Sequence, residues 1–147
     1  RVRSSAASDV YKRQLHTYNR VSDVAGVRLQ GLDTVQFLDN TNSNKEKTQH
    51  GDVAIASQTD NAYVDTESEV NLLDAQMHRQ IRLQKANSLT TVVWNPWRDA
   101  AAKLRDLGDG EWTQFLCVEA SNILGASVLL EPGQTHTMTA VLSLAEL

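Results

Sequence analysis

The sequence contains a single cysteine, Cys117, among its 147 residues. One cysteine cannot close a disulfide within the chain, so the cysteine content does not point to an oxidising compartment. We therefore expect a cytoplasmic location, with Cys117 buried in a strand as a small hydrophobic residue.

Long apolar runs are also missing. No run approaches the roughly 18 residues of a membrane-spanning helix, and the first residues lack the apolar centre of a signal peptide. Acidic residues outnumber basic ones, 18 against 14, which leaves a net charge of −4. Nucleic-acid binding draws on clustered Lys and Arg. We expect neither a membrane nor a nucleic acid as partner, whereas a few arginines would suffice to hold a small anionic substrate.

Three signatures of particular chemistries are absent. The glycines are isolated, so there is no glycine-rich phosphate loop, and no GxSxG motif marks a serine nucleophile. The residues that most often bind zinc show no paired spacing: His16, His50, His78, His136 and Cys117. We therefore expect neither a metal nor any other cofactor.

The first fourteen residues, RVRSSAASDVYKRQ, differ from the rest of the chain. They are rich in Ser, Ala and Arg and show no period, and the run SSAASDVYKRQ resembles translated adapter or vector sequence. We interpret residues 1–14 as a segment foreign to the fold, with a disordered native tail as the alternative. The domain would then comprise residues 15–147.

Most of the remaining chain has the pattern of short strands. The residues from Asn95 and Pro96 to Gly108 have the cap, first-turn and end signals of one helix. The polar residues 39–51 predict a loop, and EPGQ at 131–134 predicts a turn between two hairpin strands. Together these patterns predict an all-β fold, a sandwich or barrel with one short helix. The expected strands are 15–21, 26–29, 35–38, 53–56, 62–64, 69–73, 77–85, 89–94, 114–120, 126–130 and 135–144.

Three residues are candidates for chemistry. His16 lies beside an aromatic residue and can transfer protons at neutral pH, or it is an ordinary hydrogen-bonded histidine. Glu119 lies in FLCVEAS, a strand apolar on both faces, where burial would raise the pKa of its carboxyl. The alternatives for Glu119 are a paired Arg or a strand end that faces water. Asp60 can accept hydrogen bonds from sugar hydroxyls, or it only bonds its own backbone at a turn.

Aromatic residues offer surfaces on which the apolar faces of sugars stack. Core packing explains most tryptophans equally well, and Trp94, which continues an apolar strand, is the expected core member. The set comprises Tyr18, Tyr63, Trp94, Trp97 and Trp112.

The sequence segments LHTY, TDNAYVD, WNPW and CVEA, in this order, resemble the motifs of the glucose-6-phosphate 1-epimerase (hexose-6-phosphate mutarotase) family. The resemblance covers residues 15–143 and implies a galactose-mutarotase-like supersandwich, an antiparallel β-sandwich. The chain would hold only its C-terminal half. We expect such an incomplete sandwich to be poorly soluble and inactive on its own.

The resemblance also implies a site. The family's catalytic histidine matches His16, its catalytic glutamate matches Glu119, and its substrate-binding aspartate matches Asp60. The chain departs from many relatives at Asn19, where they have Phe, and at Asn61, where they have Arg. The basic residues that hold the phosphate in the family lie largely upstream of the HTY motif.

The implied reaction is the interconversion of the two anomers of an aldohexose 6-phosphate, without a cofactor. A base takes the proton of the C1 hydroxyl while an acid protonates the ring oxygen. The ring opens, C1 rotates, and the ring closes as the other anomer. Two alternatives stay open: a mutarotase for a non-phosphorylated aldose, and a non-catalytic carbohydrate-binding sandwich. The oligomeric state has no signal in the sequence.

Overall fold

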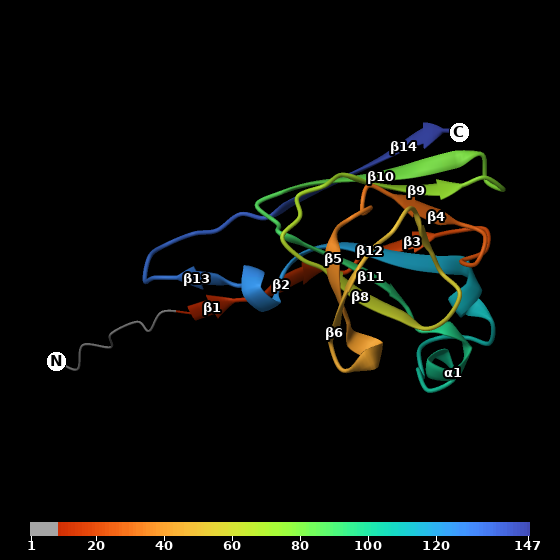
Figure 1. The fold of residues 1–147 in the computed structure, drawn as a ribbon, viewed down its shortest axis with the longest axis horizontal. Helices are drawn as coiled ribbons and strands as arrows, with labels where there is room; N and C mark the ends of the chain where they lie inside the picture. Colours follow the sequence, from red (N-terminus) through yellow and green to blue (C-terminus); the bar gives the residue numbers. More distant parts are fainter. Residues whose placement is uncertain (1–8) are drawn as a thin grey trace.

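The computed structural model describes residues 9–147, so residues 1–8 of the predicted foreign segment lie outside the described residues. Two antiparallel sheets lie face to face, and a separate two-stranded ribbon extends from one end (Figure 1). The prediction of an all-β antiparallel fold with one short helix is confirmed.

The larger sheet has seven strands in the order β2-β12-β11-β8-β5-β6, with β3 also paired to β12. Its members are β2 (Arg13–Leu15), β3 (Tyr18–Arg20), β5 (Gln36–Asp39), β6 (Lys45–Thr48), β8 (Thr59–Tyr63), β11 (Thr90–Asn95) and β12 (Phe115–Asn122).

The smaller sheet has five strands in the order β14-β10-β9-β4-β7. Its members are β4 (Arg28–Gln30), β7 (Val53–Ala54), β9 (Val70–Asp74), β10 (Arg79–Ala86) and β14 (Thr139–Glu146). The ribbon pairs β1 (Asp9–Tyr11) with β13 (Val128–Leu130).

Apolar side chains from the two sheets meet in one core. The smaller sheet contributes residues from β4, β9 and β10, and the larger sheet contributes residues from β5, β8, β11 and β12. Burial of each such side chain contributes about 1.5–3 kcal/mol. The two sets that pack between the layers are Leu29, Val70, Leu72 and Leu83, and Phe37, Tyr63, Val93, Leu116 and Val118.

Strand β12 is the central strand that positions the site. All eight of its residues are buried, because it lies between β11 on one side and β2 and β3 on the other. Leu116 and Val118 belong to the core between the sheets. Since side chains alternate along a strand, Cys117 and Glu119 point to the opposite face of the larger sheet.

Strands extend into the predicted foreign segment. In β2, Arg13 and Gln14 pair with Asn122 and Ser121 of β12, and β1 pairs with β13. The ordered structure therefore begins before Leu15. The assignment of residues 1–14 to a segment foreign to the fold stays a prediction.

The loop predicted at residues 39–51 is a hairpin instead. The helical turn η1 (Asn40–Asn42) joins β5 to β6. Asp39 is buried, and its carboxylate accepts hydrogen bonds from the N–H of Thr41 at 3.0 Å and from Lys47 Nζ at 2.6 Å. Polar residues here hold the turn by their own hydrogen bonds, so their polarity does not mark an irregular loop.

The predicted helix is much shorter than its signals suggest. It spans only α1 (Trp97–Ala101). The side-chain oxygen Oδ1 of Asn95 does accept a hydrogen bond from the backbone N–H of Trp97 at 2.9 Å, as a cap would. The chain then turns back, because Trp112 packs on Trp97 with ring centroids 4.6 Å apart. Asn95 Nδ2 also donates to the Trp112 carbonyl, so tertiary contacts end the helix before Gly108.

The predicted C-terminal hairpin is wrong, although its turn is present. The N–H of Gln134 donates to the Glu131 carbonyl at 2.9 Å. The strands on either side do not pair with each other: β13 pairs with β1, and β14 pairs with β10 over eight residues. Because β14 pairs with β10, it belongs to the five-stranded sheet, whereas β13 belongs to the two-stranded ribbon. Among the described residues, no helix has the length and apolar character needed to cross a membrane.

Candidate active site

A histidine and a glutamate meet on the outer face of the larger sheet. The predicted strand at 15–21 is split into β2 and β3, and His16 lies in the break between them. His16 Nδ1 is 3.4 Å from Glu119 Oε1. The imidazole is 43% exposed, whereas the Glu119 side chain is completely buried.

The two carboxylate oxygens of Glu119 differ in their hydrogen bonding. Its Oε2 accepts a hydrogen bond from Gln14 Nε2, while its Oε1 has no hydrogen-bond partner. Burial raises the pKa of the carboxyl to about 7; the Gln14 hydrogen bond opposes the rise, and the negative charge of Asp60 adds to it. A carboxyl that titrates near neutral pH suits proton transfer in both directions.

Asp60 lies on the same face, but not in contact with this pair. Trp94 of β11 pairs with Cys117 of β12 on one side and with Asp60 of β8 on the other. The Cα atoms of Asp60 and Cys117 are therefore two strand spacings apart, about 10 Å. Asp60 Oδ1 accepts a hydrogen bond from Asn40 Nδ2 at 2.8 Å. The structure therefore brings His16 and Glu119 together and leaves Asp60 at the far side of the same surface.

Aromatic rings surround the histidine. Tyr18 stacks on His16 with ring centroids 4.9 Å apart, and Trp94 meets it edge-on at 5.6 Å. Phe115 packs against both Tyr18 and Trp94. The expectation that Trp94 is a core residue is wrong: its side chain is half-buried on the outer face, because it alternates with Val93, which faces the core.

These rings border a cavity of about 500 Å³. Such a volume lies within the range of small-molecule sites. Glu119 is not among the residues that line the cavity, but its partner His16 is. The lining residues are His16, Tyr18, Trp94, Leu104, Asp106, Leu107 and Phe115.

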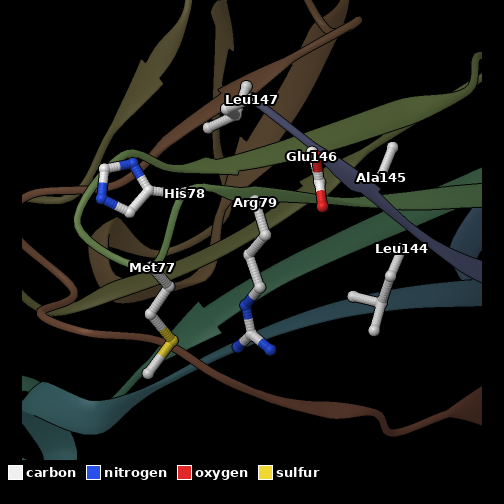
Figure 2. A pocket seen from close by; sticks show the side chains of 7 residues that line it. All are labelled: Met77, His78, Arg79, Leu144, Ala145, Glu146 and Leu147. Carbon is white, nitrogen blue, oxygen red and sulfur yellow. The ribbon is translucent and has the colours of Figure 1, made fainter.

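A larger hollow of about 590 Å³ lies elsewhere, between the start of β10 and the end of β14 (Figure 2). Figure 2 shows the side chains of Met77 and Arg79 extending to the same side. His78 and Glu146 also line this hollow, but in the described part of the chain no hydrogen bond or ion pair joins them. It lacks the coupled acid and base of the first cavity.

Sequence reasoning missed several participants. Gln14 was assigned to the foreign segment, and no local pattern relates it to Glu119, 105 residues away. The structure also brings potential metal ligands together, since the donor atoms of His16, Cys117 and Glu119 all lie within 4.8 Å of one another. Cys117 and Glu119 are two residues apart on a predicted strand, so the sequence already indicates that they share one face. No local pattern indicates that His16 lies close to them.

The chain matches the family model described as "Aldose 1-epimerase" over residues 2–143. The chain belongs to the aldose 1-epimerase family. The His16–Glu119 pair and the cavity that His16 lines are therefore the candidate active site of a family member.

Individual relatives agree with this assignment. The chain is 34% identical over 125 residues to a protein of Cenchrus ciliaris named "Putative glucose-6-phosphate 1-epimerase", covering 84% of this chain and 38% of the relative. A protein of the same name from Salmonella typhimurium is 32% identical over 106 residues, covering 71% of this chain and 36% of the relative. The chain therefore spans less than half the length of the curated relatives it matches.

Solved structures show the same fold. The crystal structure titled as a "putative mutarotase" from Salmonella typhimurium superimposes with a TM-score of 0.87 at 26% identity, covering 95% of this chain and 47% of that one. The structure of HI1317 gives a TM-score of 0.78 at 26% identity, over 93% of this chain and 47% of that one.

Proposed function

We propose that this chain is the catalytic part of a glucose-6-phosphate 1-epimerase, which interconverts the α and β anomers of an aldohexose 6-phosphate. The observation that carries the proposal is the pairing of His16 Nδ1 with Glu119 Oε1 at 3.4 Å beside an aromatic-lined cavity. The names of the curated relatives support the phosphorylated substrate.

In the proposed mechanism Glu119 is the base and His16 is the acid. The ionised Glu119 takes the proton of the C1 hydroxyl while protonated His16 donates a proton to the ring oxygen. The bond between C1 and the ring oxygen breaks, and C1 becomes an aldehyde. Rotation about C1–C2 and the reverse proton transfers close the ring as the other anomer, so no proton is gained or lost overall.

The geometry requires one local movement. Glu119 is completely buried and does not line the cavity, whereas its partner His16 does. The partly exposed imidazole must turn aside to admit the sugar, which an exposed side chain does within nanoseconds. In the proposed complex, His16 and Glu119 would then lie on different sides of C1, and Tyr18 and Trp94, whose rings contact His16, would stack on the sugar ring. Asp60 would bind a hydroxyl on the far side.

Phosphate recognition is not provided by this cavity. No Lys or Arg is among the residues that line it. We propose that the groups that hold the phosphate come from outside the cavity, as the resemblance implies. A mutarotase for a non-phosphorylated aldose remains the alternative that the described residues fit equally well.

The test is anomer exchange measured by NMR. It uses the chain extended by its own upstream coding sequence to the length of its relatives, called here the extended protein. We expect exchange on glucose 6-phosphate well above the spontaneous rate, and weaker exchange on glucose. Faster exchange on glucose would favour the non-phosphorylated aldose. A well-folded protein that accelerates neither would be a carbohydrate-binding sandwich.

The pH profile is expected to follow the Glu119 carboxyl. Below its pKa of about 7 the carboxyl is protonated and cannot act as a base, so kcat/KM should fall as the pH drops through about 7. Asp60→Asn removes a negative charge that raises this pKa, so the midpoint should move to lower pH. Asp52→Asn, an exposed aspartate, serves as the control and should leave the midpoint in place. An unshifted midpoint in Asp60→Asn would contradict this electrostatic account.

The 147-residue chain alone is expected to associate and to lack epimerase activity. Strand β14 forms an edge of the smaller sheet, and Leu142 and Leu144 are 45% and 68% exposed. An unpaired edge with apolar side chains favours association. Size-exclusion chromatography with light scattering checks this prediction, which a monomeric, active preparation would contradict.

A further inference from the structure

Three different metal-ligating atoms converge at the buried end of the candidate site. One ring nitrogen of His16, Cys117 Sγ and one carboxylate oxygen of Glu119 all lie within 4.8 Å of one another. They come from separate parts of the chain, because His16 follows β2 while Cys117 and Glu119 share one face of β12. In a tetrahedral zinc site, N, S and O donors lie about 3.3–3.8 Å apart. Movements of about 1 Å would therefore bring these three donors to coordination geometry.

One of these donors lacks any hydrogen-bond partner. Glu119 Oε1 is buried without a hydrogen bond, in a side chain that is 0% exposed. An unsatisfied buried carboxylate oxygen is costly and calls for a cation or a donor. The other oxygen, Oε2, is already occupied by Gln14. The free oxygen is the one that lies 3.4 Å from His16 Nδ1, within the cluster.

His16 is the one exposed member of the cluster. Cys117 and Glu119 are fully buried, whereas His16 is 43% exposed and lines the adjacent cavity of about 500 Å³. A cation can reach Cys117 and Glu119 from the cavity when the His16 imidazole turns aside, the same movement that admits the sugar, and a water molecule can complete four-coordination. An imidazole, a thiolate and a carboxylate form a mixed ligand set that suits Zn²⁺ and related thiophilic ions.

We propose that His16, Cys117 and Glu119 form a binding site for a thiophilic divalent cation of the Zn²⁺ class. The cation is bound through Cys117 Sγ, one Glu119 oxygen and one His16 nitrogen, and the thiol proton of Cys117 is released to solvent. The cation is not a cofactor of the proposed reaction. It occupies both proton-transfer groups, so it inhibits the enzyme in competition with the sugar. Only this inhibition rests on the proposed function; the binding does not.

Binding is tested with Co²⁺ as a spectroscopic probe of the 147-residue chain at low protein concentration. We expect one Co²⁺ per chain with an intense near-ultraviolet sulfur-to-cobalt charge-transfer band, which Zn²⁺ then displaces. Removal of an outer-shell partner costs a metal site about 10–100-fold in affinity. Loss of a direct ligand in Cys117→Ser should therefore weaken binding by about 100-fold or more and abolish the band.

Matched variants make the result decisive. Glu119→Gln tests the cluster without altering the sulfur, so it should weaken Co²⁺ binding while the remaining bound ion keeps a sulfur band. His50→Ala removes an exposed histidine outside the cluster and should change nothing. Circular dichroism establishes that each variant is folded. The proposal is overturned if Co²⁺ binds without a sulfur band, or with equal affinity to folded Cys117→Ser and Glu119→Gln.

Inhibition is measured separately on the extended protein. Added Zn²⁺ is expected to raise the KM for glucose 6-phosphate and to leave kcat unchanged, and a chelator should restore the original KM. Metal binding without epimerase activity would support the proposed metal site and contradict the proposed function. If the extended protein is active but metal binding by the folded 147-residue chain does not depend on the cluster, only the proposed metal site is contradicted.

Discussion

Glu119→Gln is expected to slow anomer exchange by the extended protein about 10²–10⁴-fold, the usual contribution of a general base. The amide has the shape of the carboxyl but cannot accept the C1 hydroxyl proton. Gln14 can still donate to the side-chain oxygen at this position, so the fold should persist. The loss should appear mainly in kcat, because the sugar contacts the aromatic rings in both proteins. Exchange spectroscopy by NMR measures the rate, and binding is followed by tryptophan fluorescence.

The control for this variant is Glu131→Gln, which neutralises an exposed glutamate outside the site and should not change the rate. His16→Gln is expected to cause a loss of similar size. The double variant should be little worse than either single one, because two groups that act as a unit are not additive. A rate that survives in a folded Glu119→Gln protein would rule out Glu119 as the base.

Gly31→Ala is expected to destabilise the extended protein by about 2–5 kcal/mol, combining two costs. Gly31 follows β4 with φ of +99°, a conformation that L-residues rarely adopt, and this costs about 1–2 kcal/mol. A Cβ there would lie 2.0 Å from the backbone carbonyl oxygen of Glu69. Backbone cannot rotate away as a side chain can, so β9 must shift, at a further cost of about 1–3 kcal/mol. Urea unfolding measures the difference.

Gly51→Ala separates the two causes. Gly51 also has a positive φ, +69°, but a Cβ there would meet nothing within 4 Å. Its replacement should cost only the conformational part, about 1–2 kcal/mol. Equal losses in the two variants would show that the contact with Glu69 is relieved without a penalty.

The parts of the fold that local patterns encode were predictable. Alternation and β-branched residues predicted most strands, including the buried β12 with Cys117 and Glu119 on one face. The predictions were wrong where a tertiary contact overrides a local signal. Asp39 and Lys47 close a hairpin within a polar segment, and the packing of Trp112 on Trp97 cuts short a helix.

The same division holds for the site. Local sequence patterns were enough to predict the all-β class and to select His16 and Glu119 as candidates, because alternation and short motifs are local properties. The burial of Glu119 stayed open until the structure showed its side chain to be 0% exposed. Only the tertiary structure decided that His16 Nδ1 approaches Glu119 Oε1, that Trp94 borders the cavity, and that Cys117 completes a set of three ligands. These contacts depend on the register in which β2 and β3 pair with β12. A register between strands about 100 residues apart is set by the packing of the whole sandwich, which no local pattern contains.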